Sequence, residues 1–423
     1  MAGADASGSG EGIGARRVRR RHVFYLGGFD PQGPAHYHRL YSGESGKQAA
    51  VGGYEIDVGP RERAGAHGAR WAVDAAWPTA SGLDEHVATT VEFLRWDDIV
   101  REHWPRSRWT VMLGTLRTTA RQLANGVLWR ILKTSWPAFL VLFLPPLLVA
   151  GLAAAFVGVL ALAAGLVLQG AGFTALVLSA VLLWLLAVFA RWAEDKVQMA
   201  WLMRSTRFIL CQARGETPQL DVRLDEFAAR VLAVCEAGEV DEVLVVGHSS
   251  GAMLAVSAVA RLAAVAPQLA RSPGAPALSL LTLGECIPML SYQPEARGFR
   301  GELARLAGET GWSWLDFTAP PDGCCFALVD PTAVCEARAS APFWRSPKRL
   351  SPRFAQMFDA PAYRALRRDK YRCHFQYLMA SQRPVPYDYF AITAGPLTLA
   401  GRFAATPGVE SFREFQMFGG PGA

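Results

Sequence analysis

Several features that define common protein classes are missing from this sequence of 423 residues. Its seven cysteines include no Cys-x-x-Cys pair, and no histidine lies at the spacing of a zinc site. This pattern argues against a zinc module and favours free thiols in a reducing compartment. No Walker loop, dinucleotide-binding fingerprint or EF-hand occurs either. We therefore expect neither a metal nor a cofactor.

Charge is missing from a long internal segment. Residues 134–190 include no charged side chain, whereas one membrane crossing needs only about 20 apolar residues. The polar, glycine-rich residues 169–172 interrupt this run. The pattern predicts two transmembrane helices, at about 137–168 and 173–190, joined by a short turn. Pro145 and Pro146 mark either a kink in the first helix or its start.

Basic residues flank the uncharged run on both sides, and the turn inside it carries none. They are Arg117, Arg121, Arg130, Lys133, Arg191, Lys196, Arg204 and Arg207. The positive-inside rule therefore predicts that both chain ends and the domain outside the hairpin are cytoplasmic. Nearly all basic residues of the chain are arginine, which is typical of a G+C-rich bacterial genome. We expect the inner membrane of a bacterium, with the amphipathic flanks 110–133 and 192–212 along its surface or extending the helices.

A cluster of arginines follows the N-terminal stretch, which is rich in Gly, Ala and Ser and has no apolar segment. The cluster comprises Arg16, Arg17, Arg19, Arg20 and Arg21. We expect residues 1–21 to be a disordered basic leader and not a cleaved signal peptide. A solvated tail beside a membrane is the preferred interpretation, and a nucleic-acid partner is not expected.

The most informative stretch is VLVVGHSSGAML, residues 243–254. Its first four residues are typical of a buried parallel strand, and residues 252–262 favour a helix packed against a sheet. Between them, Gly247, Ser249 and Gly251 fit a nucleophile elbow, a sharp strand-to-helix turn that presents a serine. The glycines let strand and helix approach where a Cβ atom would collide. The pattern predicts Ser249 as a nucleophile.

A serine nucleophile needs a histidine base, which follows the serine along the chain in this arrangement. His374 is the only histidine C-terminal to Ser249, so it is the predicted base, in a loop ahead of the last helix. His248, next to the serine, is expected to face away from the elbow and to be structural.

The acid that orients the base is expected after a strand between Ser249 and the base. Residues 277–283 and 311–315 are predicted strands, with a helix at 297–307 between them. The second strand leads to Asp316 at its tip and to Asp322 in the Pro- and Gly-rich loop beyond. We favour Asp322, keep Asp316 as the alternative acid, and regard Asp330 as a weaker third candidate.

An oxyanion hole needs two backbone N–H groups. One is expected from Ser250, the residue after the nucleophile. The other is expected from a turn that follows an earlier strand, predicted at residues 22–26. Gly27 and Gly28 let this backbone approach a ligand, so the N–H of Phe29 is the second predicted donor.

The segments VFYLGGFDP and VLVVGHSSG resemble the oxyanion loop and nucleophile elbow of α/β-hydrolases, in the GHSxG form of lipases and esterases. In this sequence Gly27 stands where that family commonly has His, and a predicted β-hairpin follows the first strand instead of preceding it. The resemblance implies an α/β fold with a mostly parallel sheet, flanking helices and an inserted transmembrane hairpin. The hydrolase domain would comprise residues 22–108 and 213–395, the hairpin with its flanks 109–212, and a C-terminal tail 396–423.

The resemblance also implies the activity. We expect a membrane-anchored serine hydrolase in which Ser249, Asp322 and His374 cleave carboxylic esters, with Phe29 and Ser250 as oxyanion donors. The expected partners are the lipid bilayer and a small ester, including lipid or acyl esters. The alternatives are an acyltransferase or thioesterase with the same triad, and a non-catalytic membrane scaffold.

Overall fold

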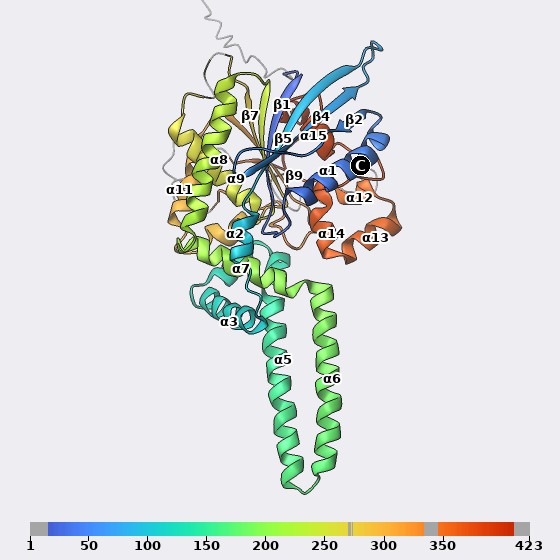
Figure 1. Cartoon of the computed structure of the whole chain (residues 1–423), viewed down its shortest axis with the longest axis vertical. Helices are drawn as coiled ribbons and strands as arrows, with labels where there is room; N and C mark the ends of the chain where they lie inside the picture. The colour runs from blue at the N-terminus through green and yellow to red at the C-terminus, as the bar shows by residue number, and fades with distance from the viewer. Residues whose placement is uncertain (1–15, 270–271, 273, 334–345, 410–423) are drawn as a thin grey trace, which may run out of the picture.

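In the computed structural model, one mostly parallel β-sheet lies above a pair of long helices (Figure 1). The structure describes residues 16–269, 272, 274–333 and 346–409. The strands are β1 (Arg20–Leu26), β2 (Glu55–Val58), β3 (Glu62–Arg63), β4 (Gly68–Trp77), β5 (Glu85–Leu94), β6 (Glu242–His248), β7 (Ala277–Leu283), β8 (Trp312–Phe317) and β9 (Lys348–Leu350).

The strand order is β2-β4-β5-β1-β6-β7-β8-β9, with β3 paired to β4. The pairs from β5 through β1, β6, β7 and β8 to β9 are parallel, whereas β2, β3 and β5 each pair antiparallel with β4. The predicted mostly parallel sheet and the predicted hairpin after the first strand are therefore confirmed.

Helices cover both faces of the sheet. The helices of the domain are α1 (Pro34–Gly52), α2 (Asp97–Glu102), α8 (Pro218–Ala237), α9 (Gly251–Val265), α10 (Ile287–Ser291), α11 (Arg297–Gly308), α12 (Phe354–Met357), α13 (Ala360–Arg368), α14 (Lys370–Phe375), α15 (Tyr389–Ala394) and α16 (Leu399–Arg402). Alternate residues of β6 serve the two cores: Val243 and Val245 pack with α8, α9 and α11, whereas Leu244 and Val246 pack with α1 and α15. This is the two-sided burial that a continuous apolar strand predicts.

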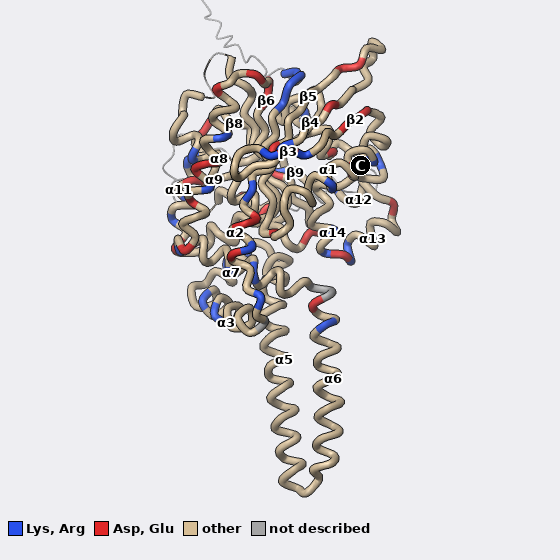
Figure 2. The backbone as a smooth tube through the Cα atoms, in the orientation of Figure 1, with Lys and Arg blue, Asp and Glu red and all other residues tan. Residues whose placement is uncertain are grey.

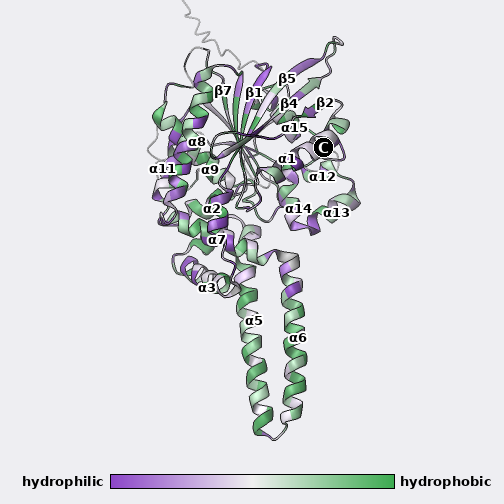
Figure 3. Ribbon diagram, in the orientation of Figure 1, coloured by the Kyte–Doolittle hydropathy of each residue, from purple (hydrophilic) through white to green (hydrophobic). Residues whose placement is uncertain are grey.

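Two long helices, α5 (Trp136–Leu168) and α6 (Gly172–Val197), project from the domain as an antiparallel pair (Figure 1). Both are long and apolar enough to cross a membrane, and only 11% and 6% of their most apolar windows are buried. Figure 3 shows hydrophobic residues along both helices, and Figure 2 shows almost no charge below their upper ends. The predicted pair of apolar helices is thus confirmed, with Pro145 and Pro146 inside α5 and not at its start.

Three further helices connect this pair to the domain: α3 (Arg108–Ala124), α4 (Val127–Thr134) and α7 (Met199–Ala213). A small apolar cluster forms where α3, α5, α6 and α7 meet, and it contains Val111, Val149, Ala193 and Met203. The hairpin is therefore packed against its own flanking helices and is not attached by a bare linker.

The prediction of a disordered leader is wrong at its C-terminal end. Strand β1 begins at Arg20, and Arg17 bridges to Leu397. The Arg21 side chain is fully buried, ion-paired to Glu242 at 2.7 Å, and donates to the carbonyl of Gly395. A buried charge is tolerated when it is paired in this way, so the arginine cluster is part of the fold. Helix α16 lies within the predicted C-terminal tail and packs beside β8. Residues 1–15 and 410–423 lie outside the described residues.

Candidate active site

Ser249 lies on a sharp turn between β6 and α9, in the order strand, turn, helix that the motif predicts. Its φ of 59° is in the left-handed region, which costs energy for a residue with a side chain. Close packing holds the turn in place: a Cβ atom on Gly251 would lie 2.2 Å from the Leu26 carbonyl oxygen, and one on Gly247 would lie 2.6 Å from Ala252 Cα. Both glycines are therefore sterically required.

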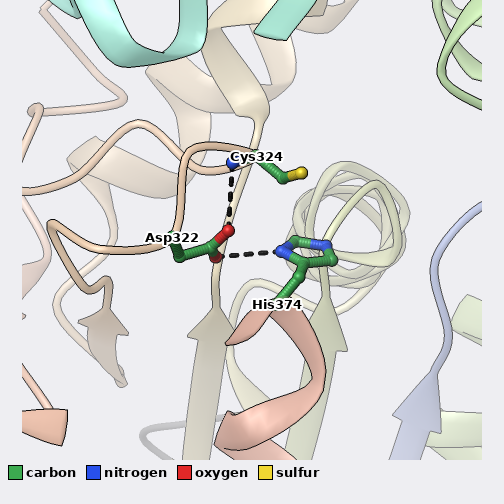
Figure 4. A group of neighbouring side chains, drawn as sticks. All are labelled: Asp322, Cys324 and His374. Atoms are coloured by element: carbon green, nitrogen blue, oxygen red, sulfur yellow. Dashed lines mark hydrogen bonds and ion pairs between the residues drawn. The ribbon is translucent and has the colours of Figure 1, made fainter. Parts of the chain in front are cut away.

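His374 and Asp322 meet in the interior of the domain (Figure 4). Nδ1 of His374 lies 2.9 Å from Oδ2 of Asp322, and both side chains are almost completely buried. Because a carboxylate only accepts, this hydrogen bond places the proton on Nδ1 and leaves Nε2 as the acceptor. His374 lies in the short helix α14 and not in the predicted loop; the Asp369 side chain accepts a hydrogen bond from the Arg372 N–H and so starts this helix.

The carboxylate of Asp322 is held ionised by its neighbours. It accepts hydrogen bonds from the Tyr377 hydroxyl at 3.1 Å and from the Cys324 N–H at 3.0 Å. Burial alone raises the pKa of Asp322, but the charge and hydrogen bond of His374 and these other donors outweigh it. The net pKa of Asp322 lies below its ordinary value, as expected for a group that stabilises a protonated imidazole.

Asp316 occupies a different environment. It lies inside β8, fully buried, and accepts a hydrogen bond from the Thr282 hydroxyl at 2.7 Å. Burial raises the pKa of Asp316 to about 7. Asp330 accepts from the hydroxyls of Thr332 and Ser346. Of the three acids, the structure brings only Asp322 within hydrogen-bond distance of His374.

His248, the residue before Ser249, contacts His374. The Nε2 of His248 donates to the His374 carbonyl oxygen at 2.9 Å, and the two rings lie 4.9 Å apart. Burial, reinforced by the charge of His374, lowers the pKa of His248 to about 3, so this ring is neutral at physiological pH. His248 was expected to be structural, and its ring does support both the backbone and the side chain of His374.

The serine hydroxyl and the histidine are not joined by a hydrogen bond in this state. Among the described residues, Nε2 of His374 has no hydrogen-bond partner, although it is buried. The Cys286 thiol lines the same cavity as Ser249. Long or unformed catalytic hydrogen bonds are common before substrate binds.

Phe29 and Ser250, the predicted oxyanion donors, are in direct contact. The N–H of Phe29 donates to the Ser250 hydroxyl at 2.7 Å. A Cβ atom on Gly28 would lie 3.0 Å from Ser249 Cβ, so the loop after β1 runs directly beside the serine. Ser250 precedes the first residue of α9, where the helix dipole favours negative charge.

The site also contains residues that the sequence analysis missed. Cys286, Cys324 and Trp201 line one cavity together with Ser249. They lie in the turns after β7 and β8 and in helix α7, far apart in the sequence. No motif links them, so only the folded chain places them together.

Asp322, Cys324 and His374 also offer potential metal-ligand atoms within 4.8 Å of one another (Figure 4). Burial and the negative charge of Asp322 raise the pKa of the Cys324 thiol, whereas a metal requires the thiolate. Asp322 already accepts the hydrogen bond of Nδ1 of His374. The chemistry of these donors therefore favours a hydrogen-bonded pair over a metal centre.

Comparisons with known proteins found no matching family model, no matching curated protein and no matching solved structure. What the chain does must therefore be argued from the site. A strained serine, a buried Asp–His pair with a free acceptor nitrogen, and backbone N–H groups beside the serine are the components of nucleophilic acyl transfer.

Proposed function

We propose that the protein is a membrane-anchored serine hydrolase of the α/β-hydrolase type that cleaves carboxylic esters. The observation that carries the proposal is the buried Asp322–His374 pair, in which His374 packs against His248, the residue before Ser249, while Ser249 is held in a left-handed conformation. A strand-to-helix turn without a catalytic role needs neither a serine in a strained conformation nor a histidine hydrogen-bonded to an ionised acid.

The proposed mechanism assigns one task to each residue. Ser249 Oγ attacks the ester carbonyl and passes its proton to Nε2 of His374, while Asp322 stabilises the imidazolium through Nδ1. The tetrahedral oxyanion accepts hydrogen bonds from the N–H groups of Phe29 and Ser250. His374 then protonates the departing alcohol, and water releases the acyl group from Ser249 by the same steps.

In the free enzyme the Phe29 N–H donates to the Ser250 hydroxyl. For catalysis this hydroxyl rotates away, and the oxyanion takes its place. The donor therefore stays satisfied before substrate arrives, which avoids leaving a buried N–H group without a partner.

The proposed setting is the cytoplasmic face of a bacterial inner membrane. Two apolar helices that could cross a bilayer, with basic residues at both ends and none in the turn, support it. The proposed partners are the bilayer and an ester substrate.

A fluorophosphonate probe tests the activity directly, because it reacts only with an activated serine. We expect the purified full-length protein to be labelled and Ser249→Ala to lose labelling completely. Ser250→Ala is the matched control: it removes the neighbouring hydroxyl but keeps the backbone N–H, so labelling persists.

Absence of labelling in wild-type protein that is folded by circular dichroism would favour a non-catalytic scaffold. Release of free acid from an ester, measured with and without an added alcohol or thiol acceptor, separates hydrolysis from acyl transfer.

A further inference from the structure

Helix α5 is longer than a bilayer requires. Its 33 residues span about 50 Å at 1.5 Å per residue, whereas the hydrocarbon core is about 30 Å thick. The first part packs against the domain, because Ala138, Pro145 and Pro146 are buried, whereas most later residues are exposed. One continuous helix therefore runs from the sheet domain into the apolar segment (Figures 1 and 3).

The upper end of α5 forms a wall of the candidate active site. The cavity that contains Ser249 is lined on one side by Ala138, Val141 and Leu142 of α5 and by Trp201 of α7. Val141 reaches Gly323, next to the acid of the pair: a Cβ atom on Gly323 would lie 3.0 Å from Val141 Cγ2. A helix that is long enough to cross the membrane thus touches the catalytic loop directly.

This cavity is small and uncharged. Its volume is about 30 Å³, enough for water but not for an ester with an acyl chain. None of the described side chains that line it is charged, and Met289 and Phe326 add apolar surface opposite α5. Because Ser249 is buried and the cavity is this small, an ester with an acyl chain reaches Ser249 only when a wall moves, and the wall suits an apolar chain.

Trp201 links the movable wall to the oxyanion loop. Its indole N–H donates to the Phe29 carbonyl oxygen at 2.8 Å, and its ring centroid lies 6.3 Å from that of His374. Displacement of α7 away from α5 would therefore change the position of Trp201 relative to both Phe29, the predicted oxyanion donor, and His374, the predicted base.

We propose that the substrate is a long-chain ester resident in the bilayer, whose acyl chain reaches Ser249 by passing between α5 and α7. Val141, Leu142 and Trp201 form this gate. Below it, the exposed side chains of Leu144 and Leu147 continue the apolar surface of α5 away from the domain. This inference rests on the proposed hydrolase activity and adds the substrate class and its route.

The test compares two esters with the full-length protein reconstituted in phosphatidylcholine vesicles. One ester is p-nitrophenyl palmitate incorporated in the bilayer, and the other is water-soluble p-nitrophenyl butyrate. Val141→Trp narrows the gate and should lower turnover of palmitate relative to butyrate by about tenfold or more. The matched control, Val157→Trp, lies on the same helix at a position exposed below the domain and should leave that ratio as in wild type.

The inference is overturned if Val141→Trp leaves the palmitate-to-butyrate ratio unchanged, or if wild type hydrolyses only the soluble ester. Both results are interpreted for protein in which the fluorophosphonate labels Ser249. If wild-type protein is not labelled, the result refutes the proposed hydrolase activity and not only the substrate route. If Val141→Trp fails to fold, Val141→Phe gives a smaller obstruction with the same expected direction.

Discussion

Two buried aspartates only a few residues apart illustrate how local environment assigns roles. The pKa of Asp322 is lowered by the charge and hydrogen bonds of its neighbours despite burial, whereas burial raises that of Asp316 to about 7. An acid that steadies a protonated histidine must be ionised at neutral pH. Asp322 meets this condition and contacts His374, whereas burial shifts Asp316 toward its protonated form and Asp316 accepts a hydrogen bond from Thr282.

We therefore expect Asp322→Asn to lower kcat for a soluble ester at pH 7.5 by about 10³- to 10⁴-fold, because the amide cannot hold the productive tautomer of His374. Asp316→Asn should stay within about threefold of wild type, since asparagine resembles a protonated aspartate and still accepts from Thr282. Steady-state kinetics on both variants, with thermal stability as a folding control, gives the comparison. A larger loss in Asp316→Asn than in Asp322→Asn would transfer the role of the acid to Asp316.

At the level of single residues, the sequence is informative where chemistry restricts the choice. Ser249 lies in a motif with a steric rationale, and His374 is the only histidine downstream of it. The contact of His248 with the base and the presence of Cys286 and Trp201 in the cavity could not be predicted. Such contacts join distant segments, and they depend on how the helices and loops pack.

At the level of elements, the turn that holds Ser249 depends on the fit of α9 against β1. A Cβ atom on Gly251 would lie 2.2 Å from the Leu26 carbonyl oxygen and 2.5 Å from that of Gly27, and backbone atoms cannot move aside cheaply. The glycine therefore sets the distance between α9 and the loop after β1, as well as the shape of the turn.

Gly251→Ala should destabilise the domain by about 2 kcal/mol or more, because it forces α9 away from β1. Gly301→Ala in α11 is the matched control: no atom lies within 4 Å of the added Cβ, and alanine favours the helix by up to about 1 kcal/mol. Thermal denaturation in detergent should show a lower midpoint for Gly251→Ala only. Equal midpoints for Gly251→Ala and wild type would contradict the steric argument.

Regular elements were the most predictable part of this fold. The predicted strand at 277–283 coincides with β7, because an uninterrupted apolar run has few alternatives in a sheet protein. The loop predicted around His374 is instead helical, since a six-residue helix has too little periodicity to detect. The proline pair lies within α5, where the sequence alone left a kink and a helix start equally open.

On the scale of the whole molecule, the hairpin lies in the sequence between strands that pair in the same sheet. Strand β1 precedes the hairpin and β6 follows it, yet they are parallel neighbours in register from Arg21 opposite Glu242 to Leu26 opposite Gly247. Two halves of one sheet must lie on the same side of a membrane. If the hairpin crosses a bilayer, the number of crossings is even, which agrees with the two apolar helices.

Cysteine labelling can decide which side that is, because the turn of the hairpin and the sheet domain must lie on opposite faces. Gln169→Cys places a thiol at the exposed turn, and Asp84→Cys places one in the exposed β4–β5 connection of the domain. With a membrane-impermeant maleimide and native Cys residues as background, we expect intact spheroplasts to label Gln169→Cys only, and lysed spheroplasts to label both. This follows from the basic residues beside the domain and the uncharged turn, which should leave the domain in the cytoplasm. Labelling of Asp84→Cys in intact spheroplasts would invert the orientation, and labelling of both before lysis would show that the hairpin does not cross the bilayer.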